Sequence, residues 1–168
     1  MDAIATTVAV DEPLEKTNRD ASIYAAVVRR LVQKDNTFGS NPGFKIVYVI
    51  HGPVQDASDP EKPVTEYEAE GAFSHDIQDG VKFLSPPVEF VAERGSVVVG
   101  EHGGSEPGRV KNRGVLIALG PIEAAGNTVE VEASLWINGL AGKWLTYVLA
   151  ETHGVWKVTG TTGSMAIS

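Results

Sequence analysis

The first hydrophobic pattern of the chain lies between Asp20 and Lys34. Its apolar residues recur every third or fourth position (Ile23, Val27, Val28 and Leu31), and basic and amide side chains occupy the other side. This spacing places the apolar side chains on one face of an α-helix. We therefore predict an amphipathic helix over 20–34, which the polar residues and glycine of 35–39 end. A flexible lead-in over 1–17 is expected before it.

The next segments predict a strand, a loop and a second helix. Phe44 to Ile50 is rich in β-branched residues and lies between prolines, which favours a strand. Residues 53–70 are mostly Asp, Glu, Pro, Ser and Lys, a composition typical of a long surface loop. Beyond the loop, one apolar face predicts a short helix that Pro86 and Pro87 end; its members are Ala72, Phe73, Ile77, Val81 and Leu84.

From Pro86 onward the pattern changes to short apolar runs separated by turns. The predicted strands are 88–91, 97–99, 110 with 114–119, 128–137, 143–150 and 155–159. Strands joined by short turns pair antiparallel, because a parallel pair needs a longer crossover. We therefore predict an α+β fold, a curved antiparallel sheet of about five to six strands with one or two helices packed on one face.

The composition is that of one domain of ordinary size. The chain has 168 residues, of which 42% are hydrophobic, so it can bury a core without metal or disulfide. We assign residues 18–168 to a single α+β domain. The chain contains no cysteine, which excludes disulfides, thiolate nucleophiles, iron–sulfur clusters and cysteine-ligated zinc.

The charge of the chain narrows the classes of partner. The formal net charge is -8, from 22 acidic and 14 basic residues, and the basic residues are scattered. Nucleic-acid binding needs a clustered basic face, so we expect no nucleic-acid partner. The apolar runs are too short to cross a bilayer, so no transmembrane segment is predicted. Residues 1–16 lack the pattern of a secretory signal, which leaves open a cytoplasmic protein or an exported one whose signal has been removed.

Histidines are the main candidates for catalysis. His51 closes the strand 44–50, and Glu101 and His102 precede a Gly-Gly-Ser turn. If these two segments converge, the three side chains form a general acid–base set or a two-histidine, one-carboxylate metal site. The alternative is that they are unrelated loop residues, because no spacing rule joins them. We interpret His75 and His153 as solvated or capping residues.

Other patterns do not predict a cofactor or a metal. Three carboxylates in the loop 56–61 could ligate Ca²⁺, but the loop lacks the EF-hand pattern, so a solvated acidic loop is favoured. The glycine clusters 100–104 and 160–163 lack the Gly-Lys-Ser/Thr of a phosphate loop, and there is no serine-hydrolase elbow. We predict no cofactor and no bound metal.

Aromatic residues concentrate in the predicted C-terminal sheet. Trp144 and Tyr147 point to opposite faces if their strand is regular, so at least one of them is available to line a surface. The segment 134–142 is unusually apolar for a connection, which favours a pocket rim or a self-association surface. The candidate ligand-binding residues are Trp136, Asn138, Leu140, Trp144 and Tyr147, although core packing is the alternative explanation for the aromatic ones.

The C-terminal hairpin carries a family resemblance. The residues from Trp144 to Gly160 (WLTYVLAETHGVWKVTG) resemble the closing hairpin of cystatin-like, nuclear-transport-factor-like domains, a superfamily that normally opens with more helix before the sheet. That resemblance implies an α+β fold and does not select an activity, since the superfamily includes enzymes and binding domains. The segments 23–32, 35–39 and 156–163 are also similar to uncharacterised small bacterial proteins, some of which carry export signals.

Two functions follow from these patterns. We favour a non-catalytic domain, of a bacterial type, that binds a small apolar molecule or a protein partner through its sheet, a homodimer being one such assembly. The alternative is a small enzyme with a cone-shaped pocket, a hydrolase, isomerase or lyase, that uses His51, Glu101 and His102.

Overall fold

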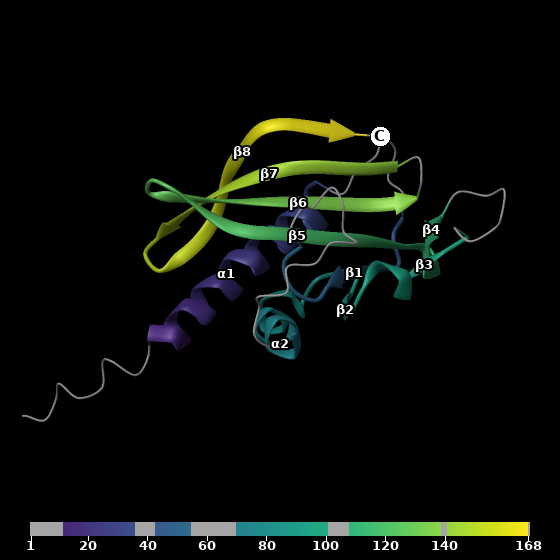
Figure 1. Cartoon of the computed structure of the whole chain (residues 1–168), viewed down its shortest axis with the longest axis horizontal. Helices are drawn as coiled ribbons and strands as arrows, with labels where there is room; N and C mark the ends of the chain where they lie inside the picture. Colours follow the sequence, from purple (N-terminus) through teal and green to yellow (C-terminus); the bar gives the residue numbers. More distant parts are fainter. Residues whose placement is uncertain (1–11, 36–42, 55–69, 101–107, 139–140, 168) are drawn as a thin grey trace, which may run out of the picture.

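The computed structural model describes residues 12–35, 43–54, 70–100, 108–138 and 141–167. These residues form two α-helices and one mixed eight-stranded sheet (Figure 1). The helices are α1 (Glu12–Gln33) and α2 (Glu70–Val81). The strands are β1 (Ile46–Ile50), β2 (Val88–Val91), β3 (Val98–Val99), β4 (Arg109–Val110), β5 (Gly114–Ala125), β6 (Thr128–Asn138), β7 (Ala141–Thr152) and β8 (Val155–Ile167). Two short 3-10 turns, η3 (Arg94–Ser96) and η4 (Lys111–Arg113), precede β3 and β5.

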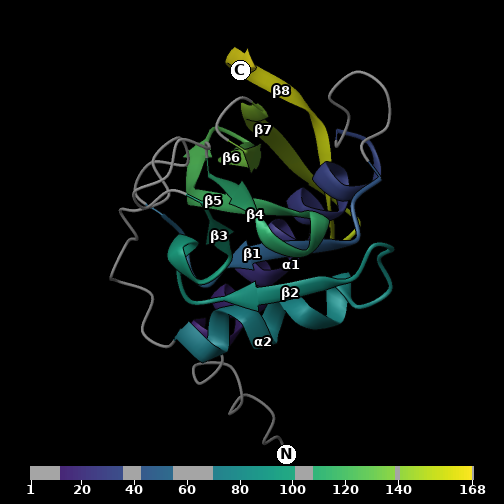
Figure 2. The ribbon, with the colours of Figure 1, turned by 90° about the vertical axis from the view of Figure 1, so that its right-hand side faces the viewer.

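The α+β class is confirmed, but the prediction of a wholly antiparallel sheet is wrong. Strands β5 to β8 form an antiparallel meander, whereas β1 pairs parallel with both β2 and β5. The reason is that α2 connects β1 to β2, so the chain crosses over and returns in the same direction. The strand count is eight rather than five to six, in part because η4 separates β4 from β5. Figure 2 shows the strands stacked from β8 to β2, with α2 beside β2.

Helix α1 builds the main core. Ile23, Val27, Val28 and Leu31, the residues of the predicted face, are completely buried against the sheet. Their partners alternate along the strands, such as Val131 on β6 with Tyr147 and Leu149 on β7. Both helices pack on this side, which we call the inner face. Helix α1 starts at Glu12, so residues 12–17 are helical rather than part of a lead-in, and residues 1–11 lie outside the described part.

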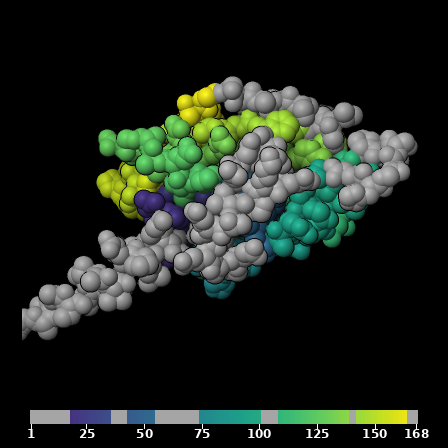
Figure 3. Space-filling model, in the orientation of Figure 1, coloured from purple at the N-terminus to yellow at the C-terminus, as the bar shows by residue number. Residues whose placement is uncertain are grey.

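On the opposite side of the sheet, the outer face, the described residues form a covering cluster over β1 and its neighbours. This second cluster joins Tyr48 and Leu116 to Val97 and Val110, which come from the segment around β3 and β4. Trp136 on β6 packs at the border of this cluster. Beyond Trp136, several outer-face residues of β5 to β8 are exposed, including Glu123, Glu132 and Thr162. In the space-filling view, the green to yellow surface of β5 to β8 lies at the left and along the top, and the teal surface of β2 and its neighbours lies at the right (Figure 3).

The two helices meet closely at Gly80. A Cβ atom placed on Gly80 would lie 2.7 Å from the Cβ atom of Ala25 and 3.3 Å from Nη1 of Arg29. Arg29 Nη1 also donates a hydrogen bond to the Gly80 carbonyl oxygen at 3.0 Å. The close approach of α1 and α2 therefore requires a glycine at position 80. This requirement explains the presence in α2 of a residue with low helix propensity.

We expect Gly80→Val to lower the free energy of unfolding by about 1–3 kcal/mol, because the new side chain overpacks the contact with Ala25. The matched control is Gly95→Val, since a Cβ at Gly95 meets no atom within 4 Å. Urea unfolding of both variants measures the difference. Equal free energies of unfolding of the two variants would contradict this expectation and show that α1 and α2 can move apart at no cost in stability.

Candidate functional site

The outer face of β6 and β7 carries two tryptophans side by side. Trp136 lies directly opposite Gly142 across the β6–β7 pair, and Trp144 lies opposite Ser134. A Cβ atom on Gly142 would lie 2.9 Å from Cη2 of Trp144 and 3.1 Å from Cδ1 of Trp136. Both indoles therefore converge over Gly142, and the missing side chain at this position makes room for them. We call Trp136, Gly142 and Trp144 the indole platform.

A cation already stacks on the platform. The guanidinium of Arg94, from η3, lies 4.6 Å from the centre of the Trp136 ring. An arginine at this distance over an indole is held by the negative charge of the ring face. Trp144 is half-buried and lies farther along the face toward β8. Trp136 and Trp144, two of the candidate ligand-binding residues, thus lie next to each other on one surface.

Tyr147 does not belong to this surface, which corrects its grouping with the tryptophans. It is fully buried on the inner face, as the alternation from Trp144 requires. Its hydroxyl donates a hydrogen bond of 2.7 Å to Oδ2 of Asp35, which also accepts a bond of 3.0 Å from Nε of Arg30. Burial, followed by the hydrogen bond and charge of Asp35, raises the pKa of Tyr147 above its ordinary value. Tyr147 therefore ties the end of α1 to β7.

Of the two remaining candidate ligand-binding residues, Asn138 lies within the described residues and Leu140 does not. Asn138 lies at the end of β6, after an irregularity in the β6–β7 register, and is paired with Arg109 of β4 and Ala141 of β7. It is close in sequence to the platform but belongs to the junction of three strands. Leu140 lies outside the described residues.

His51 lines a pocket of about 420 Å³ at the end of β1. Its backbone N–H donates to the Val91 carbonyl oxygen at 2.7 Å, and its Nδ1 atom is buried without a hydrogen-bond partner among the described residues. His75 and Gln78 of α2 line the same pocket, with Phe90 of β2. The sequence did not predict that His75 accompanies His51. The proposed partners Glu101 and His102 lie outside the described residues.

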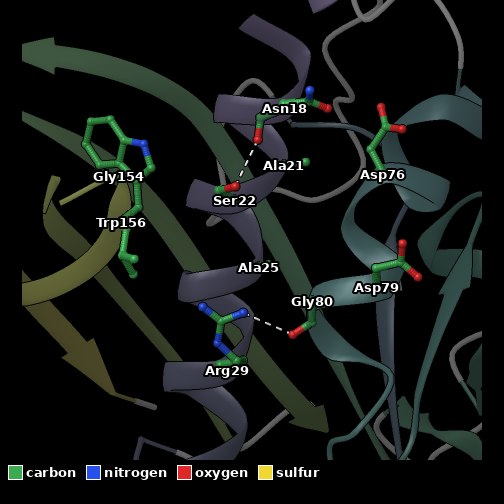
Figure 4. Close-up of a pocket in the computed structure, with 11 residues that line it drawn as sticks. Asn18, Ala21, Ser22, Ala25, Arg29, Asp76, Asp79, Gly80, Gly154 and Trp156 are labelled. Atoms are coloured by element: carbon green, nitrogen blue, oxygen red, sulfur yellow. Dashed lines mark hydrogen bonds between the residues drawn. The ribbon is translucent and has the colours of Figure 1, made fainter. Parts of the chain in front are cut away.

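A second hollow lies over α1. Figure 4 shows α1 between the start of β8, which carries Trp156, and α2, which carries Asp76 and Asp79. The hollow measures about 430 Å³, and the buried Ala21 and Ala25 line it. Arg29 is engaged with the Gly80 carbonyl oxygen, and the Asp79 carboxylate lies 3.4 Å from Nζ of Lys82. Of the charged groups that line this hollow, Arg29 therefore links α1 to α2, and Asp79 pairs with a neighbouring lysine at the end of α2.

Three carboxylates occupy the outer face beyond the platform. Glu130 and Glu132 alternate with the buried Val129 and Val131 on β6, and Glu123 of β5 lies directly opposite Glu130. With Pro121, Thr146, Thr162 and Gly163 they line a hollow of about 340 Å³. Within the described residues, no group of three His, Cys, Asp or Glu side chains is placed to hold a metal ion.

Comparison with protein-family models, with curated proteins and with solved structures found no match to this chain. Across the ranges that the structure describes, neither helix is long and apolar enough to cross a membrane. The geometry of the surfaces is therefore the basis for any assignment of function.

The bond between Tyr147 and Asp35 predicts a pH-dependent stability. Tyr147→Phe should lower the free energy of unfolding by about 1.5–3 kcal/mol, the range for a hydrogen bond to a charged group. Because the folded pKa of Tyr147 lies above the unfolded one, this difference is complete below pH 10.0 and shrinks as the pH rises further. Urea titrations of both proteins at several pH values measure it, and a difference that stays constant above pH 10.0 would contradict the raised pKa.

Proposed function

We propose that this protein is a non-catalytic interaction domain that binds a protein partner through the outer face of β5 to β8. The observation that carries the proposal is the indole platform, in which two half-buried tryptophans share a surface that neither helix covers. Tryptophan is enriched among the residues that dominate binding energy, because a large ring buries much area at small cost in conformational entropy. The resemblance to cystatin-like domains stays a prediction, and the proposal does not depend on it.

The sheet edges support a contact through the face. β8 is long, but its register with β7 is interrupted twice: Thr159 has no opposite residue in the β7 register, and residues 163–165 lie opposite Leu145 alone. β2, at the other end, has four residues and follows Pro86 and Pro87. Bulges, short strands and prolines are the devices that prevent another strand from adding to an edge. A partner is therefore expected on the face and not along an edge.

The test is selection of binding peptides from a displayed library with the purified chain. Peptides so selected should bind Trp144→Ala at least tenfold more weakly, because the platform loses one of its two indoles. Trp156→Ala is the matched control, since Trp156 is also half-buried but packs against the inner-face core. Circular dichroism confirms that both variants are folded.

Two results would contradict the proposal. One is equal loss of binding in Trp144→Ala and Trp156→Ala. The other is a library that yields no binding peptide. Sedimentation equilibrium tests a second copy of the chain as the partner, and in that case Trp144→Ala should shift a dimer to monomer while Trp156→Ala does not.

The second candidate is the enzyme that uses His51. It is favoured by one observation, the pocket that brings His51 and His75 together. Paired imidazoles supply a general acid and a general base near neutral pH. For this candidate we expect hydrolysis of at least one ester in a substrate panel. His51→Gln should reduce the rate of hydrolysis at least a hundredfold, and Trp144→Ala should not change it. Absence of turnover across esters, lactones and small ketones would remove the candidate.

A further inference from the structure

We propose that the partner of the outer face is an extended peptide segment with arginine or lysine at alternate positions. This inference rests on the proposed function, because it names the chemistry of what the same face binds. It starts from the distribution of charge along the face. The carboxylates gather toward the β5–β6 turn, and the indoles gather toward the β6–β7 end.

The carboxylates of the face are uncompensated. Glu123 and Glu130 are directly opposite each other on neighbouring strands, an arrangement in which like charges reduce stability. Glu132 follows Glu130 on the same side of β6. Among the described side chains, no lysine or arginine forms an ion pair with any of the three. The face therefore keeps a local repulsion that an external cation would relieve.

The spacing of the carboxylates suits an extended peptide better than a metal ion. Glu130 and Glu132 are two residues apart on a strand, so their Cα atoms are separated by about 6.5–7 Å. Among the described residues the carboxylates are not gathered closely enough to hold a metal ion. An extended peptide repeats its side chains on one side at the same interval of about 6.5–7 Å. Cationic side chains at alternate positions would each meet one carboxylate.

The indole platform extends the match beyond the carboxylates. In the order of the β6–β7 pairs, Glu130 with Val148 and Glu132 with Thr146 are followed by Ser134 with Trp144. A peptide that lies along β6 would therefore place its next side chain at Trp144. Arg94 over Trp136 shows the contact that a guanidinium makes on this platform. Carboxylates and an indole in one line recognise the charge and the planar group of arginine.

The test uses the full chain and a blocked six-residue peptide that alternates arginine with alanine. We expect saturable binding by fluorescence anisotropy, weakened at least tenfold in the double variant Glu130→Gln, Glu132→Gln and weakened by added salt. Glu89→Gln, Glu151→Gln is the matched control, because it removes the same charge from exposed positions on β2 and at the end of β7. The control variant should bind as the parent does. Removing like charges should leave the double variant at least as stable as the parent.

Four outcomes would overturn the inference. The first is that the arginine peptide does not bind, and the second is that the control variant weakens binding as much as the double variant does. The third is that the same peptide with citrulline in place of arginine binds as tightly as the arginine peptide. The fourth is that spermine at matched charge displaces the labelled peptide as well as the unlabelled arginine peptide does. If the citrulline peptide binds as tightly as the arginine peptide and this binding is lost in Trp144→Ala, the proposed function is supported and the cationic partner is wrong. If every library peptide binds Trp144→Ala as tightly as it binds the parent, the proposed function itself is wrong.

Discussion

Burial of one face of α1 against the sheet is the interaction on which the rest of the structure depends. Ile23, Val27 and Leu31 are completely removed from solvent there, and each such side chain contributes about 1.5–3 kcal/mol. Because strand side chains alternate, this contact also decides which residues of β6 and β7 face the helix and which face away. The inner set includes Val131 and Tyr147, and the outer set includes Glu132 and Trp144. The outer face is thus a consequence of where α1 packs.

The described residues cover one part of the outer face. The segments around η3, β3 and β4 pack against β1 and β5 on the side opposite the helices, and there Val97 and Val110 are buried. Trp136 packs at the border of this cluster, and Arg94 stacks on its indole. The long meander from β5 to β8 continues beyond the cover, with polar and aromatic side chains outward. A surface of this kind stays folded without a partner because its inner face supplies the core.

The sequence predicted the elements that local periodicity defines. The three- and four-residue spacing located the buried face of α1, and the alternation in Thr128–Ile137 located β6. Alternation also predicted that Trp144 and Tyr147 lie on opposite faces. It could not show the parallel pairing of β1, because that depends on α2 acting as a crossover between two strands. The meeting of His51 with His75 depends on the same crossover, and the role of Gly142 depends on cross-strand register. These are relations between distant residues, which periodicity within one segment does not contain.

The three tryptophans of the chain allow a direct test of the proposed surface. The measurement is the set of indole N–H resonances in a nitrogen–proton correlation spectrum during titration with the arginine–alanine peptide. Binding at the outer face predicts shifts for Trp136 and Trp144 that saturate together, while the resonance of Trp156 stays in place. Shifts of Trp156 alone, or equal shifts of all three, would contradict binding at the indole platform.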